Sequence, residues 1–418
     1  MADALDVYLN ENFVGRLREE KGRLFFAYDK AWLESSRFIP LSVTMPRQAE
    51  EFADEVTRAF FDNLLPEGDI RAAIAKLKRV SERNTFGLLA EIGGDCAGAI
   101  SLWPEGEKPG TNEGYAAISD GRLNRLLADM RKRPLLAIDD ELRLSLAGAQ
   151  DKLPVYYDGT RLALPKGSAP SSHILKPGSP GFAHMPVNEH FCMRLAAASG
   201  LPVPQSEVLR KAKALYLVQR YDRVKAPDGS LTRIHQIDFC QALNLPSSRK
   251  YEKEGGPSLP ACFDVIAKYC AQPAKDRLEI ISWAIFNYLV GNADAHAKNL
   301  SLLITPEGIS LAPFYDLIST VVYRGLILNL ALKIGGENRP DWIQERHWKA
   351  FAEASGANPR IVWQRMAELS ATIPGKAREL LAAFDIGKEE REMLERISSV
   401  ADKRAARLAG FKAVRRHA

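Results

Sequence analysis

Three polar residues that together could carry out phosphoryl transfer lie near one another in the sequence. Asp294 is followed five positions later by Asn299, and a second aspartate, Asp316, comes after the aromatic residues Phe314 and Tyr315. Phosphoryl transfer needs a carboxylate that accepts the proton of the attacking hydroxyl, and oxygen ligands that hold Mg²⁺ against the phosphates. These side chains supply that set. We therefore predict Asp294 as the base, and Asn299 and Asp316 as the metal ligands.

A helix, a loop and a hairpin must position these residues. Apolar side chains over residues 278–290 have the spacing of a mostly buried helix, which ends at Gly291. Residues 292–299 then form a polar loop. Two short apolar runs within residues 300–311, separated by Pro-Glu-Gly, predict a hairpin that leads to Asp316.

The spacing of Asp294 and Asn299 equals that of the H-R-D-x-x-x-x-N loop of protein kinases, and Asp316 stands where a kinase has its D-F-G aspartate. Each residue also has an ordinary structural explanation. Asp294 and Asn299 would cap a turn, His296 would be a structural histidine, and Asp316 would begin a helix as its N-cap. Their joint occurrence on one helix–loop–hairpin favours the kinase interpretation. Metal-assisted hydrolysis is an alternative, but few histidines and acids cluster here for a two-metal site.

The other half of a nucleotide site has candidates earlier in the chain. The segment from Ser145 to Lys152 joins two predicted strands through small residues, so its backbone N–H groups could approach a phosphate. It matches neither G-x-x-x-x-G-K-[ST] nor G-x-G-x-x-G, and an ordinary hairpin turn has the same spacing. Lys176 follows an apolar strand and precedes Pro177, which ends it. We predict that Lys176 contacts the phosphates and pairs with Glu189. The alternatives are that Lys176 is a solvated surface lysine and that Glu189 is a favourable acidic residue near a helix N-terminus.

A buried strand at residues 214–221 ends in polar residues, as a hinge between two lobes would. We predict that backbone groups from Gln219 through Arg220 to Tyr221 read the adenine edge and that the tyrosine ring stacks beside it. Asp222 and Arg223 are predicted to form an ion pair that fixes this hinge.

Strands dominate the first half of the chain and helices the second. Predicted strands cover residues 5–9, 13–17, 24–28, 142–146, 153–157, 161–164, 173–175, 207–209 and 214–221, and predicted helices cover residues 50–61, 71–77, 85–92 and 187–199. After residue 223 we expect helices and a single hairpin. This order predicts an α+β fold, two-lobed and protein-kinase-like, with a cleft between the lobes. A chain of 418 residues exceeds one core, and we expect three parts: 1–138, a strand-rich lobe at 139–223 and a helical lobe at 224–418.

Composition excludes several other classes of protein. The five cysteines are scattered without a C-x-x-C pair, which disfavours a disulfide framework or a zinc site. No basic leader and no run of membrane-spanning length is present, so we expect a cytoplasmic protein without membrane contact.

The net charge of +5 is mild and does not argue for nucleic-acid binding. A helix predicted from residue 389 onward ends in basic residues, which form either a solvated face or a nucleic-acid contact: Lys403, Arg404, Arg407, Lys412, Arg415 and Arg416.

Several of these segments in this order resemble the HipA family, the toxin kinases of bacterial type II toxin–antitoxin systems. They are SLAGAQDK at residues 145–152, HILKP at 173–177, QRYDR at 219–223, GNADAHAKN at 291–299 and FYD at 314–316. FFDNLLP at residues 60–66 is similar to the first subdomain of that family. The resemblance covers nearly the whole chain and implies a kinase that binds ATP and Mg²⁺.

The resemblance also implies roles for individual residues and partners. The residues it places at the nucleotide or its metal are Ala147, Gly148, Ala149, Gln150, Asp151, Lys152, Lys176, Gln219, Arg220, Tyr221, His296, Ala297, Lys298, Asn299, Tyr315 and Asp316. Ser145 would be autophosphorylated, and its phosphate would compete for the loop amides and disorder the loop. The implied partner is a HipB-like helix-turn-helix antitoxin, through which the kinase reaches operator DNA. The implied substrate is an aminoacyl-tRNA synthetase, whose phosphorylation stops translation.

Two other functions remain open on the sequence. The same scaffold could serve a small-molecule phosphotransferase, because only the acceptor site differs. A DNA-associated corepressor with a vestigial kinase site is the second.

Overall fold

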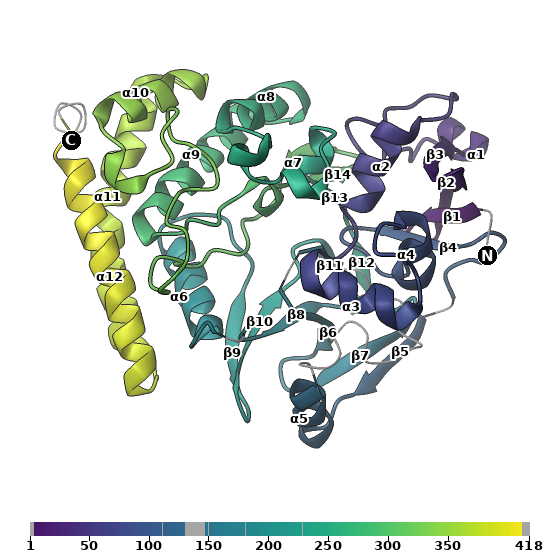
Figure 1. Ribbon diagram of the computed structural model, residues 1–418, viewed down its shortest axis with the longest axis horizontal. Coiled ribbons are helices and arrows are strands. Elements are labelled where there is room, and N and C mark those ends of the chain that lie inside the picture. Colours follow the sequence, from purple (N-terminus) through teal and green to yellow (C-terminus); the bar gives the residue numbers. More distant parts are fainter. Residues whose placement is uncertain are drawn as a thin grey trace. The chain divides into compact units, whose positions relative to one another are not determined.

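The structure is a computed structural model that describes residues 4–110, 112–129, 147–148, 150–179, 181–227 and 229–411 (Figure 1). The described chain divides into two compact units. The first comprises Met1–Pro177, Leu209–Ser247 and Leu302–Ile309, and the second Gly178–Val208, Ser248–Ser301 and Ser310–Ala418. The first unit holds most of the strands and the second the long helices, so the predicted α+β class is confirmed.

The first unit begins with a four-stranded antiparallel sheet of order β3-β2-β1-β4. Its strands are β1 (Ala4–Leu9), β2 (Asn12–Glu20), β3 (Arg23–Tyr28) and β4 (Ile100–Pro104). The helices between β3 and β4 are α1 (Lys30–Glu34), α2 (Asp54–Asp62), α3 (Gly68–Lys78) and α4 (Thr85–Ile92). The strands and helices predicted before residue 100 are all present, with ends that differ by a few residues.

A second, six-stranded sheet carries the predicted nucleotide-facing residues of this unit. Its order is β5-β7-β6-β8-β10-β9. The strands are β5 (Asn112–Ala117), β6 (Leu153–Tyr157), β7 (Leu162–Gly167), β8 (His173–Pro177), β9 (Ser206–Arg210) and β10 (Ala214–Gln219). Alternate side chains, among them Leu153, Leu175 and Leu217, form one core with Leu123 of α5 (Asp120–Asp129). The strand predicted at residues 142–146 lies outside the described residues.

Short strands follow the predicted hinge, and the sequence did not predict the first three of them. β11 (Arg223–Lys225) pairs with β12 (Leu231–Arg233), and β13 (His235–Asp238) joins the predicted hairpin of β14 (Ser301–Thr305) and β15 (Gly308–Leu311). α7 (Phe239–Ala242) follows β13. The expectation of a single hairpin after residue 223 was therefore wrong. Strands of three or four residues are too short for an alternating pattern to be recognised.

The second unit is built around α9 (Pro273–Val290), which is buried from Ile280 to its end. α9 packs against α8 (Leu259–Tyr269), α11 (Pro359–Ala383) and α12 (Lys388–Ala409). α6 (Met185–Ala198) and α10 (Glu345–Ala354) complete the unit, and Figure 1 shows α12 in yellow as one long helix. Because α9 is buried on every side from Ile280 onward, this part is a rigid base for the loop that follows it.

The remaining expectations from composition can be compared with the structure. All five cysteines are buried and free, which agrees with the prediction against disulfides. Among the described helices, none has the length and apolar character needed to cross a membrane. Arg404 donates to the carbonyl oxygen of Tyr288 and Arg407 to that of Asp341. Two of the six basic residues at the C-terminal end therefore have partners within the fold, while Lys412, Arg415 and Arg416 lie outside the described residues.

Candidate active site

The loop after α9 is fixed at its start by backbone conformation and by amide side chains. α9 ends at Gly291, whose φ of 78° is left-handed, and an added Cβ would lie 2.4 Å from a methyl carbon of Val321. Asn292 donates to the side-chain oxygen of Asn287 at 2.8 Å and accepts from the backbone N–H of Asp294 at 3.0 Å. Asp294 is thereby held in position although its side chain is exposed.

The carboxylate of Asp294 has a partner that the sequence did not reveal. The hydroxyl of Tyr251 donates to Oδ1 of Asp294 at 2.7 Å. Tyr251 lies 43 residues earlier in the chain. No spacing pattern connects residues that far apart, so only the fold identifies Tyr251.

Asn299 and Asp316 are brought together as predicted. Asn299 ends a short 3₁₀ turn (Ala297–Asn299), and its side-chain oxygen accepts from the backbone N–H of His296 at 3.0 Å. Its Nδ2 donates to Oδ2 of Asp316 at 3.3 Å. The hydroxyl of Tyr315 donates to the carbonyl oxygen of Lys298 at 2.6 Å, which ties the segment after the hairpin to the loop. These contacts lie within the second unit.

The backbone at Asp316 excludes one of the structural alternatives. Its φ is 54°, and residues 312–320 contain no helix. Asp316 is therefore not the N-cap of a helix. Non-glycine residues adopt this left-handed conformation at a cost, and Asp and Asn tolerate it better than most others. Such local strain is often found at functional sites.

His296 and Lys298, predicted near the phosphates, are both buried. Burial, helped by the charge of Lys250, lowers the pKa of His296 to about 3. His296 is therefore neutral at physiological pH, and its ring packs edge-on against Tyr251 with centroids 5.2 Å apart. It adds no positive charge to the loop.

The Asp316 carboxylate and the Asn299 amide are side chains of the kinds that can hold a magnesium ion. Mg²⁺ prefers oxygen ligands and is usually held by one or two carboxylates together with substrate phosphates and water. The Asp316 carboxylate and the Asn299 amide oxygen would hold it.

In the first unit, the described part of the predicted phosphate loop is tied to two neighbouring segments. The ammonium of Lys152 donates to the carbonyl oxygen of Ala147 at 2.6 Å, and Gln150 donates to that of Pro177 at 3.4 Å. Gly148 has φ of 111° and accepts from the N–H of Glu67 at 3.1 Å. Ser145 and Ala149 lie outside the described residues.

Lys176 lies on β8 and is only 5% exposed, so it is not a solvated surface lysine. It stands opposite Tyr216 of β10, with its ammonium 5.6 Å from the centre of the tyrosine ring. Its predicted pairing with Glu189 stays a prediction.

A buried ion cluster surrounds the residues that follow β10, where the sequence predicts a hinge. Asp222 contacts Arg220 at 2.7 Å and Arg223 at 2.9 Å, so the predicted Asp222–Arg223 ion pair is confirmed. Asp95 completes the cluster by contacting Arg223 at 3.3 Å and Arg233 at 3.0 Å. Burial alone would raise the pKa of Asp95, but the arginines outweigh it and hold the pKa below its usual value. The sequence did not reveal Asp95, because these partners are 128 and 138 residues away.

The cluster limits which groups of Arg220 could contact a ligand. Its guanidinium is in the cluster, and its backbone N–H donates to the carbonyl oxygen of Ser172 at 2.9 Å. Gln219 is exposed at the end of β10, and the hydroxyl of Tyr221 donates to the side chain of Gln236. The Arg220 guanidinium and N–H therefore have partners within the fold, and adenine recognition by the backbone of Gln219, Arg220 and Tyr221 stays a prediction.

Comparison with known proteins identifies the family. The model of the HipA-like C-terminal domain matches residues 144–377, and that of the HipA N-terminal domain matches residues 5–103. The chain belongs to the HipA family. It is similar to Y4mE of Sinorhizobium fredii, with 40% identity covering 91% of this chain and 93% of that protein. It is also similar to the serine/threonine-protein kinase toxin HipA of Shewanella oneidensis, with 32% identity covering 90% and 89%.

A solved structure gives the same result for the whole HipA fold. The Shewanella oneidensis HipA chain, in a complex with HipB and its operator DNA, matches with a TM-score of 0.88 and 30% identity, covering 99% of both chains. The chain therefore has the two-lobed, protein-kinase-like HipA fold and is an enzyme of the kinase class.

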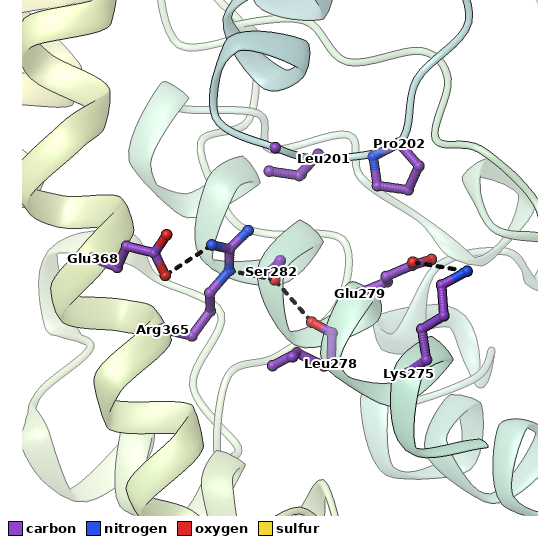
Figure 2. Close-up of a pocket in the computed structure, with 9 residues that line it drawn as sticks. Leu201, Pro202, Lys275, Leu278, Glu279, Ser282, Arg365 and Glu368 are labelled. Atoms are coloured by element: carbon purple, nitrogen blue, oxygen red, sulfur yellow. Dashed lines mark hydrogen bonds and ion pairs between the residues drawn. The ribbon is translucent and has the colours of Figure 1, made fainter. Parts of the chain in front are cut away.

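A pocket of about 260 Å³ lies in the second unit between α9, α11 and residues 200–202 (Figure 2). Figure 2 shows that its charged side chains point toward one another: Arg365 pairs with Glu368 at 2.9 Å and donates to Ser282 at 2.8 Å. None of the predicted site residues lines it. The pocket is therefore separate from the candidate active site.

Proposed function

We propose that this HipA-family chain is an ATP-dependent protein kinase that phosphorylates serine or threonine. The observation that carries the proposal is the contact of Asp316 with Asn299, which lies on the same loop as Asp294. A carboxylate for the acceptor hydroxyl and two oxygen ligands for Mg²⁺ are what phosphoryl transfer needs from the protein.

Each residue has a separate task in this proposal. Asp294 orients the acceptor hydroxyl and takes its proton as the hydroxyl oxygen attacks the γ-phosphorus, while the bond to the bridging oxygen of ADP breaks. Asp316 and Asn299 would hold Mg²⁺, which would offset the charge of the phosphates. Lys176 and the loop at residues 147–152 contact the phosphates.

The test is transfer of phosphate from Mg-ATP, followed by intact-mass spectrometry of the chain and of added proteins. The wild-type chain is expected to phosphorylate serine or threonine, and Asp294→Asn, which keeps the size of the side chain, is expected to lose transfer by a factor on the order of 10³. If the wild-type chain binds no nucleotide, the kinase proposal is wrong and the corepressor alternative gains. Transfer to small molecules alone would favour the small-molecule phosphotransferase.

The biological role is proposed from the family. The chain would be the toxin of a type II toxin–antitoxin system, neutralised by a HipB-like antitoxin that also connects it to operator DNA. Support comes from its similarity to a HipA whose structure was solved with HipB and operator DNA. The proposed substrate is an aminoacyl-tRNA synthetase, and the proposed inactivating site is Ser145.

A growth assay tests this role. Expression of the wild-type chain is expected to arrest growth, and Asp316→Asn or coexpression of a neighbouring helix-turn-helix protein is expected to restore it. An active kinase that leaves growth unchanged would contradict the toxin role without affecting the kinase proposal. Mass spectrometry of the same cells would show whether Ser145 and a synthetase carry phosphate.

A further inference from the structure

The segment from Lys250 to Lys253 is packed directly onto the loop that carries Asp294. The carbonyl oxygen of Lys250 accepts from the N–H of Ala297 at 3.3 Å, and the Tyr251 hydroxyl donates to Asp294 at 2.7 Å. The tyrosine ring also packs edge-on against His296. Three different contacts thus connect this segment to the polar loop.

The segment is also fixed from its other side. The N–H of Glu252 donates to the carbonyl oxygen of Ala331 at 3.1 Å, and the N–H of Ala331 donates to that of Ala293 at 3.0 Å. The Glu252 carboxylate accepts from the N–H of Lys333 at 2.7 Å. Ala293, next to Asp294, and Glu252, next to Tyr251, are therefore both hydrogen-bonded to Ala331. This shared partner limits the movement of Asp294 relative to Tyr251.

A tight turn sets the direction of Tyr251. The N–H of Gly256 donates to the carbonyl oxygen of Tyr251 at 3.0 Å. An added Cβ at Gly256 would lie 2.1 Å from the carbonyl oxygen of Arg249 and 2.7 Å from that of Tyr251, so only glycine fits there. Lys250 and Lys253 place their ammonium groups 5.5 and 5.7 Å from the centre of the tyrosine ring. The turn fixes the backbone of Tyr251, and the two lysines contact its ring.

We infer that Tyr251 is a positioning residue for Asp294, an inference that rests on the proposed role of Asp294 as the base. Exposed side chains on loops exchange between rotamers, and a general base works only within hydrogen-bond reach of the acceptor proton. A hydrogen bond from a fixed hydroxyl to Oδ1 sets the plane of the carboxylate before the acceptor arrives. Pre-orientation of this kind raises the rate of the chemical step without changing the affinity for ATP.

The variant Tyr251→Phe removes one oxygen and keeps the ring contacts with His296 and the lysines. The matched control is Tyr269→Phe, in α8, because Tyr269 also has a lysine ammonium over its ring, that of Lys268 at 4.8 Å. Wild type, both variants and Asp294→Asn are incubated as full-length proteins with Mg-ATP. The rate at which phosphate appears on the chain is measured by intact mass over a range of ATP concentrations.

Tyr251→Phe is expected to lower the maximal rate about tenfold, with KM for ATP and the thermal midpoint unchanged, whereas Tyr269→Phe keeps the wild-type rate. A rate in Tyr251→Phe equal to wild type, while Asp294→Asn is inactive, would overturn the inference and leave the proposed function standing. Equal rates in Asp294→Asn and wild type would overturn both. Phosphate mapped to Tyr251 itself would make it an acceptor and would also overturn the positioning role.

Discussion

Nδ2 of Asn299 lies 3.3 Å from Oδ2 of Asp316, although the whole β14–β15 hairpin separates the two residues in the chain. Asp316 reaches this position with φ of 54°. The residue at this position must therefore provide a carboxylate and also accept a left-handed backbone. These two requirements can be separated by substitution.

Asp316→Asn keeps the preference for the left-handed conformation but removes the charge, whereas Asp316→Ala removes both. We expect both variants to lose phosphate transfer by a factor on the order of 10³, because the proposed Mg²⁺ ligand is lost. Only Asp316→Ala should also lose about 1 kcal/mol of unfolding free energy. Transfer is followed by mass spectrometry and stability by urea unfolding. Equal stability losses would show that the backbone conformation carries no cost.

The predicted phosphate loop gives a second prediction. Gly148 has φ of 111°, and an added Cβ would lie 2.6 Å from the ammonium of Lys152. Gly148→Ala should strain the backbone and push Lys152 away from the carbonyl oxygen of Ala147. If this loop contacts the phosphates, ATP affinity should fall about tenfold.

Gly159→Ala is the matched control for this loop. Gly159 lies in the turn between β6 and β7 with φ of 101°, and an added Cβ would meet nothing within 4 Å. Its variant has the same type of backbone strain without the contact to a lysine. We expect it to bind ATP as wild type does in a calorimetric titration. An equal loss of affinity in both variants would indicate a general effect of strain rather than a role of the loop.

Much of the fold and part of the site can be predicted from the sequence because their signals are local. The α9 helix has a continuous apolar pattern, and the Asp294–Asn299 spacing lies within one loop. Tyr251 and Asp95 have no such signal. Each acts through partners distant in the chain, and a buried arginine–aspartate cluster reads in the sequence as scattered surface charge.

The pH dependence of stability gives a third prediction. His235 is 1% exposed, and its Nε2–H donates to the carbonyl oxygen of Leu41 at 2.7 Å. Burial lowers the pKa of His235 to about 4, against about 6.5 in an unfolded chain. The unfolded state therefore binds more protons between these values, so this contribution to stability is complete above pH 6.5 and is lost as the pH falls toward 4.

His235→Gln removes this titration and keeps an amide that can donate to Leu41. When the pH is lowered from 7.5 to 5, wild type should lose about 2 kcal/mol more unfolding free energy than the variant does. Urea unfolding of both proteins at the two pH values measures these losses. Parallel pH profiles would contradict a neutral buried His235.

The last prediction compares two ion pairs of equal length. Arg220–Asp222 and Arg378–Asp402 both have a nitrogen–oxygen distance of 2.7 Å, but the side chains are 2% and 3% exposed in the first pair and 60% and 46% in the second. Burial alone would raise the pKa of Asp222, but Arg220 and Arg223 together hold it well below its usual value. Removal of a buried partner leaves a charge uncompensated, whereas water compensates an exposed one.

Asp222→Ala is therefore expected to cost about 3–5 kcal/mol of unfolding free energy, and Asp402→Ala at most about 1 kcal/mol.

The milder Asp222→Asn keeps an oxygen that can accept from the N–H of Gly98, a bond of 2.8 Å in the structure. Because Asp222 is next to the proposed adenine hinge, this variant should raise KM for ATP several-fold and leave the maximal rate unchanged. A variant with lowered stability and an unchanged KM would show that the cluster supports the fold without positioning the hinge.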